Sequence, residues 1–219
     1  MTADVIEQEP FSYYNNPCTW VTSLIEGEGL RVLDVGCSKG EAGKHLLDTG
    51  KAAWVSGVEL DHTRAAFASR RLNEVICDDV TTLVFPWPVN HFDCITFHDV
   101  LEHVADPWSL LARLRPLLKP DGILLASVPN VRFFPVIYDL LIHNEWRYQD
   151  FGVMDRGHLR FFTKKTTLEM FNQAGFKVDH IAPYLTGLRY KLPSRLSFGL
   201  LDNFMSAQWR IRARLARHS

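Results

Sequence analysis

The stretch VLDVGCSKGEAGKHLL, Val32–Leu47, decides how the rest of the chain is interpreted. An apolar run ends in a turn of small residues, and a helical pattern begins directly after it. A strand, a small-residue turn and a helix start form the corner with which α/β folds bind phosphate or nucleotide groups. The dinucleotide fingerprint G-x-G-x-x-G does not fit, because Glu41 takes the place of its third glycine. The stretch therefore predicts a nucleotide-binding corner of another kind.

Acidic residues at the ends of three predicted strands indicate the ligand. Asp34 lies two residues before the turn, where a carboxylate would repel a pyrophosphate and attract an ammonium group. Glu59 ends the next apolar run, where a carboxylate can accept both hydroxyls of a ribose. Asp78 and Asp79 follow the third run, and one of them could accept a hydrogen bond from an adenine amino group. The predicted ligand is a nucleoside that carries an amino acid.

Apolar and amphipathic segments alternate along the chain. Strands are expected at 30–35, 52–60, 73–77, 91–97, 122–130 and 177–185, and helices at 40–50, 61–72, 106–122 and 167–176. Strands that are apolar on both faces predict a parallel sheet covered by helices. Residues 208–216 alternate with period two and carry arginines on one side, which predicts a half-exposed strand at or near a sheet edge.

Composition narrows the classes of protein. With 219 residues, 47% of them hydrophobic, and a net charge of −1, the chain is expected to form one domain with no nucleic-acid partner. Four cysteines without a CxxC pair argue against a structural zinc site and a disulfide framework, and no metal is predicted. The first residues lack the order of a signal peptide, and no apolar run is long enough to span a bilayer. A cytoplasmic location is expected.

Five stretches in order resemble the successive motifs of the class I S-adenosylmethionine-dependent methyltransferases: VLDVGCSKG, VSGVELD, VICDDV, FDCITFHDVLEHVADP and LKPDGILLASVPN. They cover roughly residues 30–130. The resemblance implies a Rossmann-like, seven-stranded, mostly parallel sheet with helices on both faces and an antiparallel final strand at 208–216. Residues 1–29 would form an N-terminal helical segment, and residues 130–163 a lid inserted after the fifth strand.

The resemblance also implies S-adenosylmethionine as the cofactor, with S-adenosylhomocysteine as the product. The methionine end would lie on Asp34 and the turn after it, and Glu59 would hold the ribose. Leu60 would pack on the adenine ring. Asp78 would bind the adenine amino group, and the backbone amide of Asp79 would bind a ring nitrogen of the adenine. The implied cofactor-binding residues are Asp34, Gly36, Cys37, Ser38, Gly40, Glu59, Leu60, Asp78, Asp79 and, through its main chain, His98. Ser38 stands where the family usually has glycine.

Two histidines are candidates for a catalytic base that takes the acceptor's proton. His98 follows the fourth strand and would serve either as a base or through its backbone. His158 lies in DRGHLRFFT (155–163), which resembles a segment of a bacterial branch linked to glycan and secondary-metabolite O-methylation, including relatives of ubiquinone-pathway enzymes. There His158 would be a base with positioning charges, or the segment would be a salt-bridged hinge of the lid.

The resulting hypothesis is a methyltransferase acting on an oxygen of a small-molecule acceptor, such as a sugar, polyketide or quinone-like compound, by in-line displacement. Alternatives are a C- or N-methyltransferase, a cofactor-binding partner protein without catalysis, and a NAD-dependent oxidoreductase, which Asp34 and Glu41 argue against. The arginines of 208–216 are expected to form a solvated face or a homodimer contact rather than a nucleic-acid surface.

Overall fold

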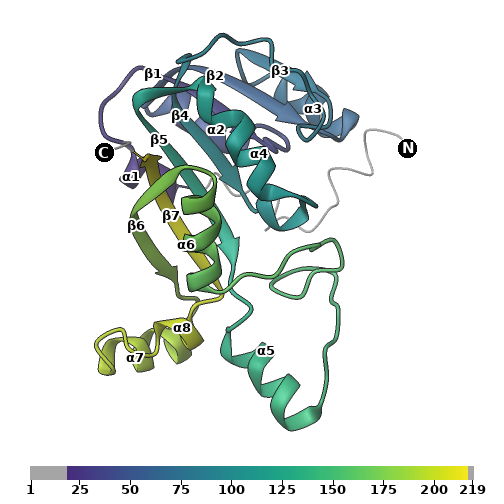
Figure 1. Cartoon of the computed structure of the whole chain (residues 1–219), viewed down its shortest axis with the longest axis vertical. Coiled ribbons are helices and arrows are strands. Elements are labelled where there is room, and N and C mark those ends of the chain that lie inside the picture. Colours follow the sequence, from purple (N-terminus) through teal and green to yellow (C-terminus); the bar gives the residue numbers. More distant parts are fainter. Residues whose placement is uncertain (1–18, 217–219) are drawn as a thin grey trace. The chain divides into compact units, whose positions relative to one another are not determined.

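The computed structural model describes residues 19–216, in two compact units divided after Pro86 (Figure 1). The first unit opens with α1 (Trp20–Leu24), a single helix turn within the predicted N-terminal helical segment. Positions 1–18 of that predicted segment lie outside the described residues.

The first unit contains three parallel strands in the order β3-β2-β1. These are β1 (Leu30–Val35), β2 (Ala52–Glu59) and β3 (Glu74–Cys77), and α2 (Glu41–Asp48) and α3 (His62–Ala68) pack against β2. The side chains of Val32, Leu33 and Val55 are fully buried. Both helices begin where expected, and Asp61 caps α3 by accepting a hydrogen bond from the Arg64 amide at 2.8 Å.

The second unit pairs parallel and antiparallel strands. β4 (Phe92–His98) runs parallel to β5 (Leu118–Pro129), and β7 (Gln208–Leu215) lies between β5 and β6 (Phe176–Tyr184), antiparallel to both. The described residues thus hold seven strands, mostly parallel with antiparallel strands at the end, and the predicted fold class is confirmed.

The final strand behaves as its alternation predicts. Trp209, Ile211 and Ala213 are buried, while Arg212 and Arg214 each place Nε 2.9 Å from the Asp179 carboxylate on β6. These arginines therefore hold the last two strands together. β7 lies next to β6, the last strand of this order, so it is near the sheet edge as expected.

The helix expected at 106–122 is too long and is corrected by the structure. α4 (Pro107–Leu114) ends before Pro116, which lies in a 3-10 turn, and β5 already begins at Leu118. Proline has no amide hydrogen and its ring clashes with the preceding helical turn, so the helix cannot continue through this position. Asp106 caps α4 as predicted, accepting from the Ser109 amide at 3.0 Å.

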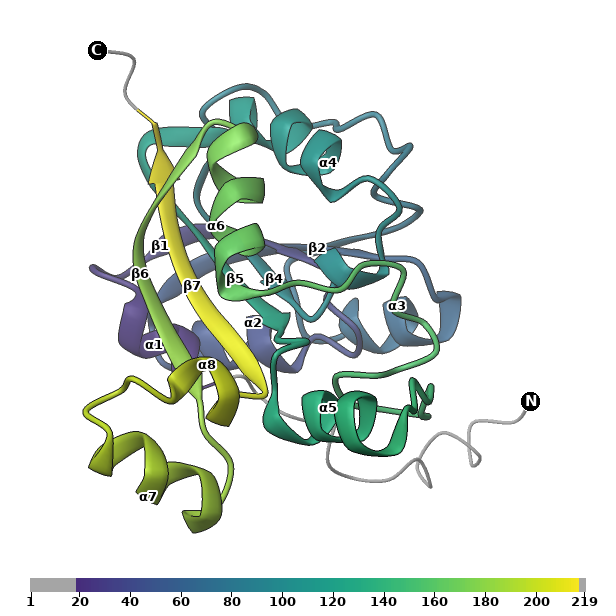
Figure 2. The same ribbon diagram turned by 60° about the horizontal axis from the view of Figure 1, so that its bottom comes forward.

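α6 (Lys164–Gln173) begins three residues earlier than expected, because Thr163 and Thr166 form a capping box. Figure 2 shows α6 lying along β6. Gly175 closes the helix with a left-handed φ of +83°.

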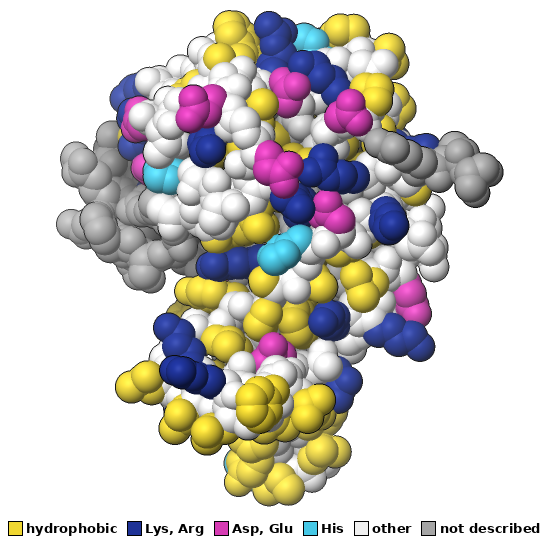
Figure 3. Space-filling model, turned by 90° about the vertical axis from the view of Figure 1, so that its left-hand side faces the viewer, with side chains coloured by type: hydrophobic (Ala, Val, Ile, Leu, Met, Phe, Trp, Pro, Cys, Tyr) yellow, Lys and Arg dark blue, Asp and Glu magenta, His cyan; other side chains and the backbone are white. Residues whose placement is uncertain are grey.

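Several short helices in the second unit were not predicted. The predicted lid contains α5 (Phe134–Tyr138) and a π-helical turn at Asp139–His143, and α7 (Leu188–Leu196) and α8 (Asp202–Met205) precede β7. Large apolar side chains are exposed on α7 and the loop after it, at the lower end of the face in Figure 3: Leu188, Leu192, Leu196, Phe198 and Leu200.

Within residues 19–216, no helix is long and apolar enough to cross a membrane.

Candidate active site

The turn after β1 is fixed to β2 by backbone hydrogen bonds. The amides of Gly36 and Cys37 both donate to the Val58 carbonyl, at 2.8 and 3.1 Å, and the Gly40 amide donates to the Cys37 carbonyl at 2.8 Å. Gly40 has a φ of +80°, and a Cβ there would lie 3.1 Å from the Ala68 Cα, so only glycine suits this corner. The turn predicted from the sequence is therefore a rigid corner at the carboxyl end of β1.

Glu41 has a structural partner in the same corner. Its carboxylate lies 2.9 Å from the guanidinium of Arg71, which also donates to the Lys39 carbonyl at 2.7 Å. The residue that breaks the dinucleotide fingerprint thus joins the start of α2 to the segment after α3.

Negative charge is concentrated beneath the turn. Asp34 is buried, and burial together with the charges of Asp34 and Glu59 raises the pKa of the Cys37 thiol, which stays neutral. Burial is the larger cause of this shift, and the two carboxylates add negative charge that would attract a cation. The binding of an ammonium group here stays a prediction.

Glu59 connects three elements of the first unit. One carboxylate oxygen accepts from the Ser38 amide at 2.8 Å, and the other accepts from the Asp61 amide at 2.9 Å. Each carboxylate oxygen has a second lone pair, so Glu59 can bind both hydroxyls of a ribose without releasing the backbone. The turn, β2 and the start of α3 are thereby positioned around one carboxylate.

The predicted adenine residues follow β2 and β3. The Leu60 side chain is 68% exposed, which is unusual for leucine and provides an apolar surface beside Glu59. Asp79 uses its carboxylate locally, accepting from the Thr81 amide at 2.8 Å and the Thr81 hydroxyl at 2.7 Å. Asp78 is exposed and accepts from the Asp79 amide at 2.7 Å, so this amide would reach a ring nitrogen only after Asp78 turns away.

Ser38 has two features that matter for a ligand. Its hydroxyl oxygen is buried and has no hydrogen-bond partner among the described residues. Its φ is +49°, in the left-handed region, which explains why the family prefers glycine here. An orphaned hydroxyl, carboxylates that would attract a cation, and an exposed leucine beside the Glu59 carboxylate together fit S-adenosylmethionine.

The backbone strain at Ser38 gives a testable result. Left-handed backbone costs an L-residue roughly 1–2 kcal/mol, and the extra freedom of unfolded glycine offsets about 0.5–1 kcal/mol of the relief. We expect Ser38→Gly to unfold with a free energy about 1 kcal/mol higher than Ser38→Ala, which lacks the hydroxyl but keeps the strain. Urea titration of both variants measures this difference, and equal stabilities would contradict it.

His98 is the last residue of β4, in the second unit, whereas the other predicted cofactor residues lie in the first. Both ring nitrogens are buried, and burial together with the charge of Arg210 lowers the pKa of His98 to about 4. The ring is therefore neutral near pH 7 and a weak proton acceptor. This favours the interpretation in which His98 acts through its backbone.

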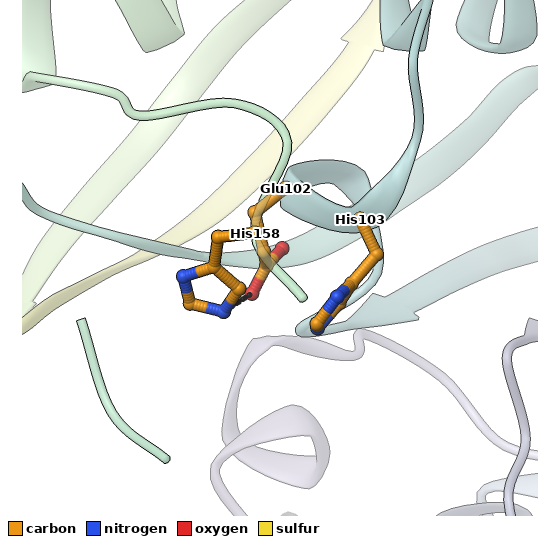
Figure 4. A group of neighbouring side chains, drawn as sticks. All are labelled: Glu102, His103 and His158. Atoms are coloured by element: carbon orange, nitrogen blue, oxygen red, sulfur yellow. Dashed lines mark ion pairs between the residues drawn. The ribbon is translucent and has the colours of Figure 1, made fainter. Parts of the chain in front are cut away.

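His158 comes together with two residues of η2 (Leu101–His103), as Figure 4 shows. The amides of Leu159 and Arg160 donate to the Glu102 carbonyl at 2.8 and 3.0 Å, which fixes the segment to η2. The Nε2 of His158 then lies 3.9 Å from Oε1 of Glu102. The rings of His103 and His158 meet edge to face with centroids 4.8 Å apart.

Glu102 is the most unusual member of this cluster. It is fully buried, and within residues 19–216 neither carboxylate oxygen has a hydrogen-bond partner. Burial and the nearby charge of Asp99 raise the pKa of Glu102 well above its ordinary value, and burial lowers the pKa of His158. Sequence reasoning missed Glu102, which lies between Leu101 and His103, and no pattern in the sequence showed that it would be buried.

The charges of the DRGHLRFFT segment are used to hold its loop. The Asp155 carboxylate accepts from the Gly157 amide at 2.6 Å, Arg156 pairs with Asp150 at 2.9 Å, and the Arg160 Nε donates to the Ala105 carbonyl at 2.9 Å. His158 is the member that points into the buried cluster (Figure 4). The segment thus combines features of both interpretations, a fastened loop and an inward histidine.

Comparison with known proteins decides the family. A family model described as a methyltransferase domain matches residues 14–181, most of the chain. The chain belongs to this family. Its strands have the order of a class I S-adenosylmethionine-dependent methyltransferase, the family that the sequence motifs resemble.

Curated relatives of this methyltransferase match it in part. A ubiquinone biosynthesis O-methyltransferase of Haemophilus ducreyi is 33% identical over 111 residues, covering 47% of this chain and 46% of its own length. One from Coxiella burnetii is 30% identical over 128 residues, covering 56% and 53%. The methyltransferase spans about half the length of the curated relatives it matches.

Solved structures share its fold over nearly the whole chain. An S-adenosylmethionine-dependent methyltransferase from Mesorhizobium loti is 18% identical with a TM-score of 0.64, covering 91% of this chain and 98% of its own. One from Archaeoglobus fulgidus is 17% identical with a TM-score of 0.65, covering 90% of each. At these identities the likeness concerns the Rossmann-like fold alone.

Proposed function

We propose that this methyltransferase transfers a methyl group from S-adenosylmethionine to a hydroxyl oxygen of a small molecule. The observation that carries the proposal is the acidic corner of the first unit, in which Glu59 receives the amides of Ser38 and Asp61 above a buried Asp34. That corner fits a ligand with an ammonium group and a ribose, and it does not fit a pyrophosphate.

The chain's residues have distinct roles in this proposal. Asp34 and the turn Gly36–Gly40 hold the amino-acid end, Glu59 the ribose hydroxyls, and Leu60 and Asp78 the base. The bound cofactor supplies a methyl group activated on a sulfonium centre. The protein orients the acceptor oxygen in line with that group and excludes water.

The acceptor class rests on two supports. The curated relatives are named as O-methyltransferases of ubiquinone biosynthesis, which points to a ring hydroxyl. The predicted lid supplies aromatic surface, since Trp146 and Tyr148 pack on Phe161 with ring centroids 5.4 and 6.2 Å apart. Aromatic faces suit a flat, ring-shaped acceptor.

His158 stays the predicted base that takes the acceptor's proton. Its Nδ1 donates to the Val153 carbonyl at 3.0 Å, so the nitrogen left to accept a proton is Nε2. His98, with its pKa near 4, is the weaker candidate.

Calorimetry and a transfer assay test the proposal in two steps. We expect S-adenosylhomocysteine to bind the chain with micromolar affinity and NADH not to bind. We then expect a labelled methyl group to pass to catechol-type acceptors and not to matched amines. Absence of S-adenosylhomocysteine binding at millimolar concentration would refute the cofactor assignment. Binding without transfer to any hydroxyl, amine or carbon acceptor would instead support a cofactor-binding partner protein.

A further inference from the structure

We propose that Glu102, His103 and His158 form a binding site for a divalent transition-metal ion. One ligand atom from each of the three residues lies within 4.8 Å of the other two, although His158 comes from a distant part of the sequence. The sequence predicted no metal, because its cysteines have no metal-binding spacing. The amides of Leu159 and Arg160, which donate to the Glu102 carbonyl, hold this part of the lid against η2 and bring His158 to the cluster.

Both histidines leave Nε2 available for a metal. The Nδ1 of His103 lies 3.0 Å from the Gly157 carbonyl, and the Nδ1 of His158 lies 3.0 Å from the Val153 carbonyl. A carbonyl oxygen only accepts hydrogen bonds, so each Nδ1 carries the proton and each Nε2 keeps its lone pair. Metal-binding histidines in proteins are oriented in the same way, with the second ring nitrogen donating to a carbonyl or a carboxylate.

Glu102 supplies the independent reason to expect a cation. A carboxyl group with no exposed surface and no hydrogen-bond partner within residues 19–216 is costly to keep in a folded protein. Such groups are found where they are paired with a charge or coordinate a metal. No lysine or arginine side chain makes an ion pair with Glu102 in the described part of the chain; its nearest ionisable neighbour is the neutral imidazole of His158, whose Nε2 lies 3.9 Å from Oε1 of Glu102.

The two imidazoles and the carboxylate indicate which metal ions the site would bind. Two imidazoles and one carboxylate suit Zn²⁺, Mn²⁺, Fe²⁺ or Co²⁺, whereas Mg²⁺ and Ca²⁺ prefer oxygen ligands. Ligand atoms about 2.0–2.2 Å from a metal lie roughly 3.0–3.5 Å apart, so small side-chain rotations close the observed spacing. Three protein ligands leave coordination positions open, as in catalytic metal sites, and the exposed His103 gives access from solvent.

A role in catalysis for this ion rests on the proposed function. A hydroxyl oxygen bound at an open position of the metal would lose its proton more readily, and the proton would pass to solvent. His158 cannot bind the metal and accept a proton through the same Nε2. The metal site therefore replaces the base role of His158, and the two interpretations differ in whether transfer needs a metal.

Cobalt titration of the chelator-treated full chain tests the site without any methyl transfer. We expect one Co²⁺ per chain by elemental analysis, with a d–d absorption spectrum, and affinity about 100-fold or more lower in Glu102→Gln and His103→Ala. Glu102 is buried, and Glu102→Gln can fail to fold for that reason alone. His103 is exposed, so His103→Ala keeps the core intact and tests the site independently. Cys77→Ser is the matched control, because Cys77 Sγ and His62 Nδ1 lie 3.1 Å apart and are the rival pair in the first unit.

The outcomes separate cleanly. Loss of Co²⁺ binding in Glu102→Gln and His103→Ala, with unchanged binding in Cys77→Ser and unchanged thermal unfolding of His103→Ala, supports the site. Absence of binding in the parent chain at millimolar Co²⁺, or loss of binding in Cys77→Ser alone, overturns it. Co²⁺ binding in a chain that does not bind S-adenosylhomocysteine would support the metal site and refute the proposed function.

Discussion

Replacing Glu59 with alanine is expected to weaken S-adenosylhomocysteine binding by at least about 100-fold. The carboxylate is the predicted partner of both ribose hydroxyls, and hydrogen bonds to a charged group contribute about 1.5–3 kcal/mol each. The same substitution leaves the amides of Ser38 and Asp61 without their acceptor, so we also expect the free energy of unfolding to fall by about 2–4 kcal/mol. Calorimetric titration and urea unfolding measure the two effects separately.

Two further variants make the Glu59 result specific. Glu59→Gln keeps one oxygen acceptor and should fall between the parent chain and Glu59→Ala in both measurements. Asp48→Ala removes an exposed carboxylate paired with Lys44 at 2.6 Å and should change stability by less than about 0.5 kcal/mol, with no effect on binding. If Glu59→Ala bound the nucleoside within threefold of the parent chain, the ribose assignment would be wrong.

Gly57→Ala is expected to lower the free energy of unfolding by about 1–3 kcal/mol and to weaken cofactor binding as well. A Cβ at this position of β2 would lie 2.6 Å from the Cys37 Sγ and 3.0 Å from a Leu72 methyl carbon. Since Cys37 belongs to the turn, relief of this overlap must move the turn. Thermal unfolding and titration with S-adenosylhomocysteine, applied to the same variant, measure both consequences.

A double-mutant cycle identifies the cause. Cys37→Ala removes the sulfur that the new methyl group meets, so Gly57→Ala should cost at least about 1 kcal/mol less in the Cys37→Ala background. Additive effects of the two substitutions would show that the overlap with Cys37 is not what destabilises the variant.

The alternation of apolar and amphipathic segments predicted the strands of both units, because each strand is a short apolar run that can be recognised without knowing the rest of the fold. Asp61 and Asp106 mark helix starts for a local reason, since each side chain caps the helix that follows it. The helix predicted at 106–122 is too long for a local reason too: its leucines continue the helical pattern past Pro116, where a proline ends the helix. α7 and α8 were not predicted because their apolar side chains are largely exposed, so no buried face produces a period.

The candidate site also has a part that the sequence indicates and a part that it does not. The predicted cofactor-binding residues of the first unit lie at strand ends and in turns of one continuous segment, where sequence motifs and the family resemblance point to them without a structure. The cluster around Glu102 depends on contacts between η2 and a loop of the lid, which spacing does not reveal. Whether a carboxylate inside an apolar run is exposed or buried is decided by the tertiary fold, and here it is fully buried.

The position of β7 has a consequence for synthesis on the ribosome. β5 and β6 do not pair with each other; each pairs with β7, which is the last of the strands to be translated. At about 5–20 residues per second, β6 waits for several seconds with its pairing edge uncovered while residues 185–215 emerge. During that interval β6 has no partner strand, so it is open to chaperones and to pairing with other chains. Burial of Trp209 then reports the moment at which the second unit closes.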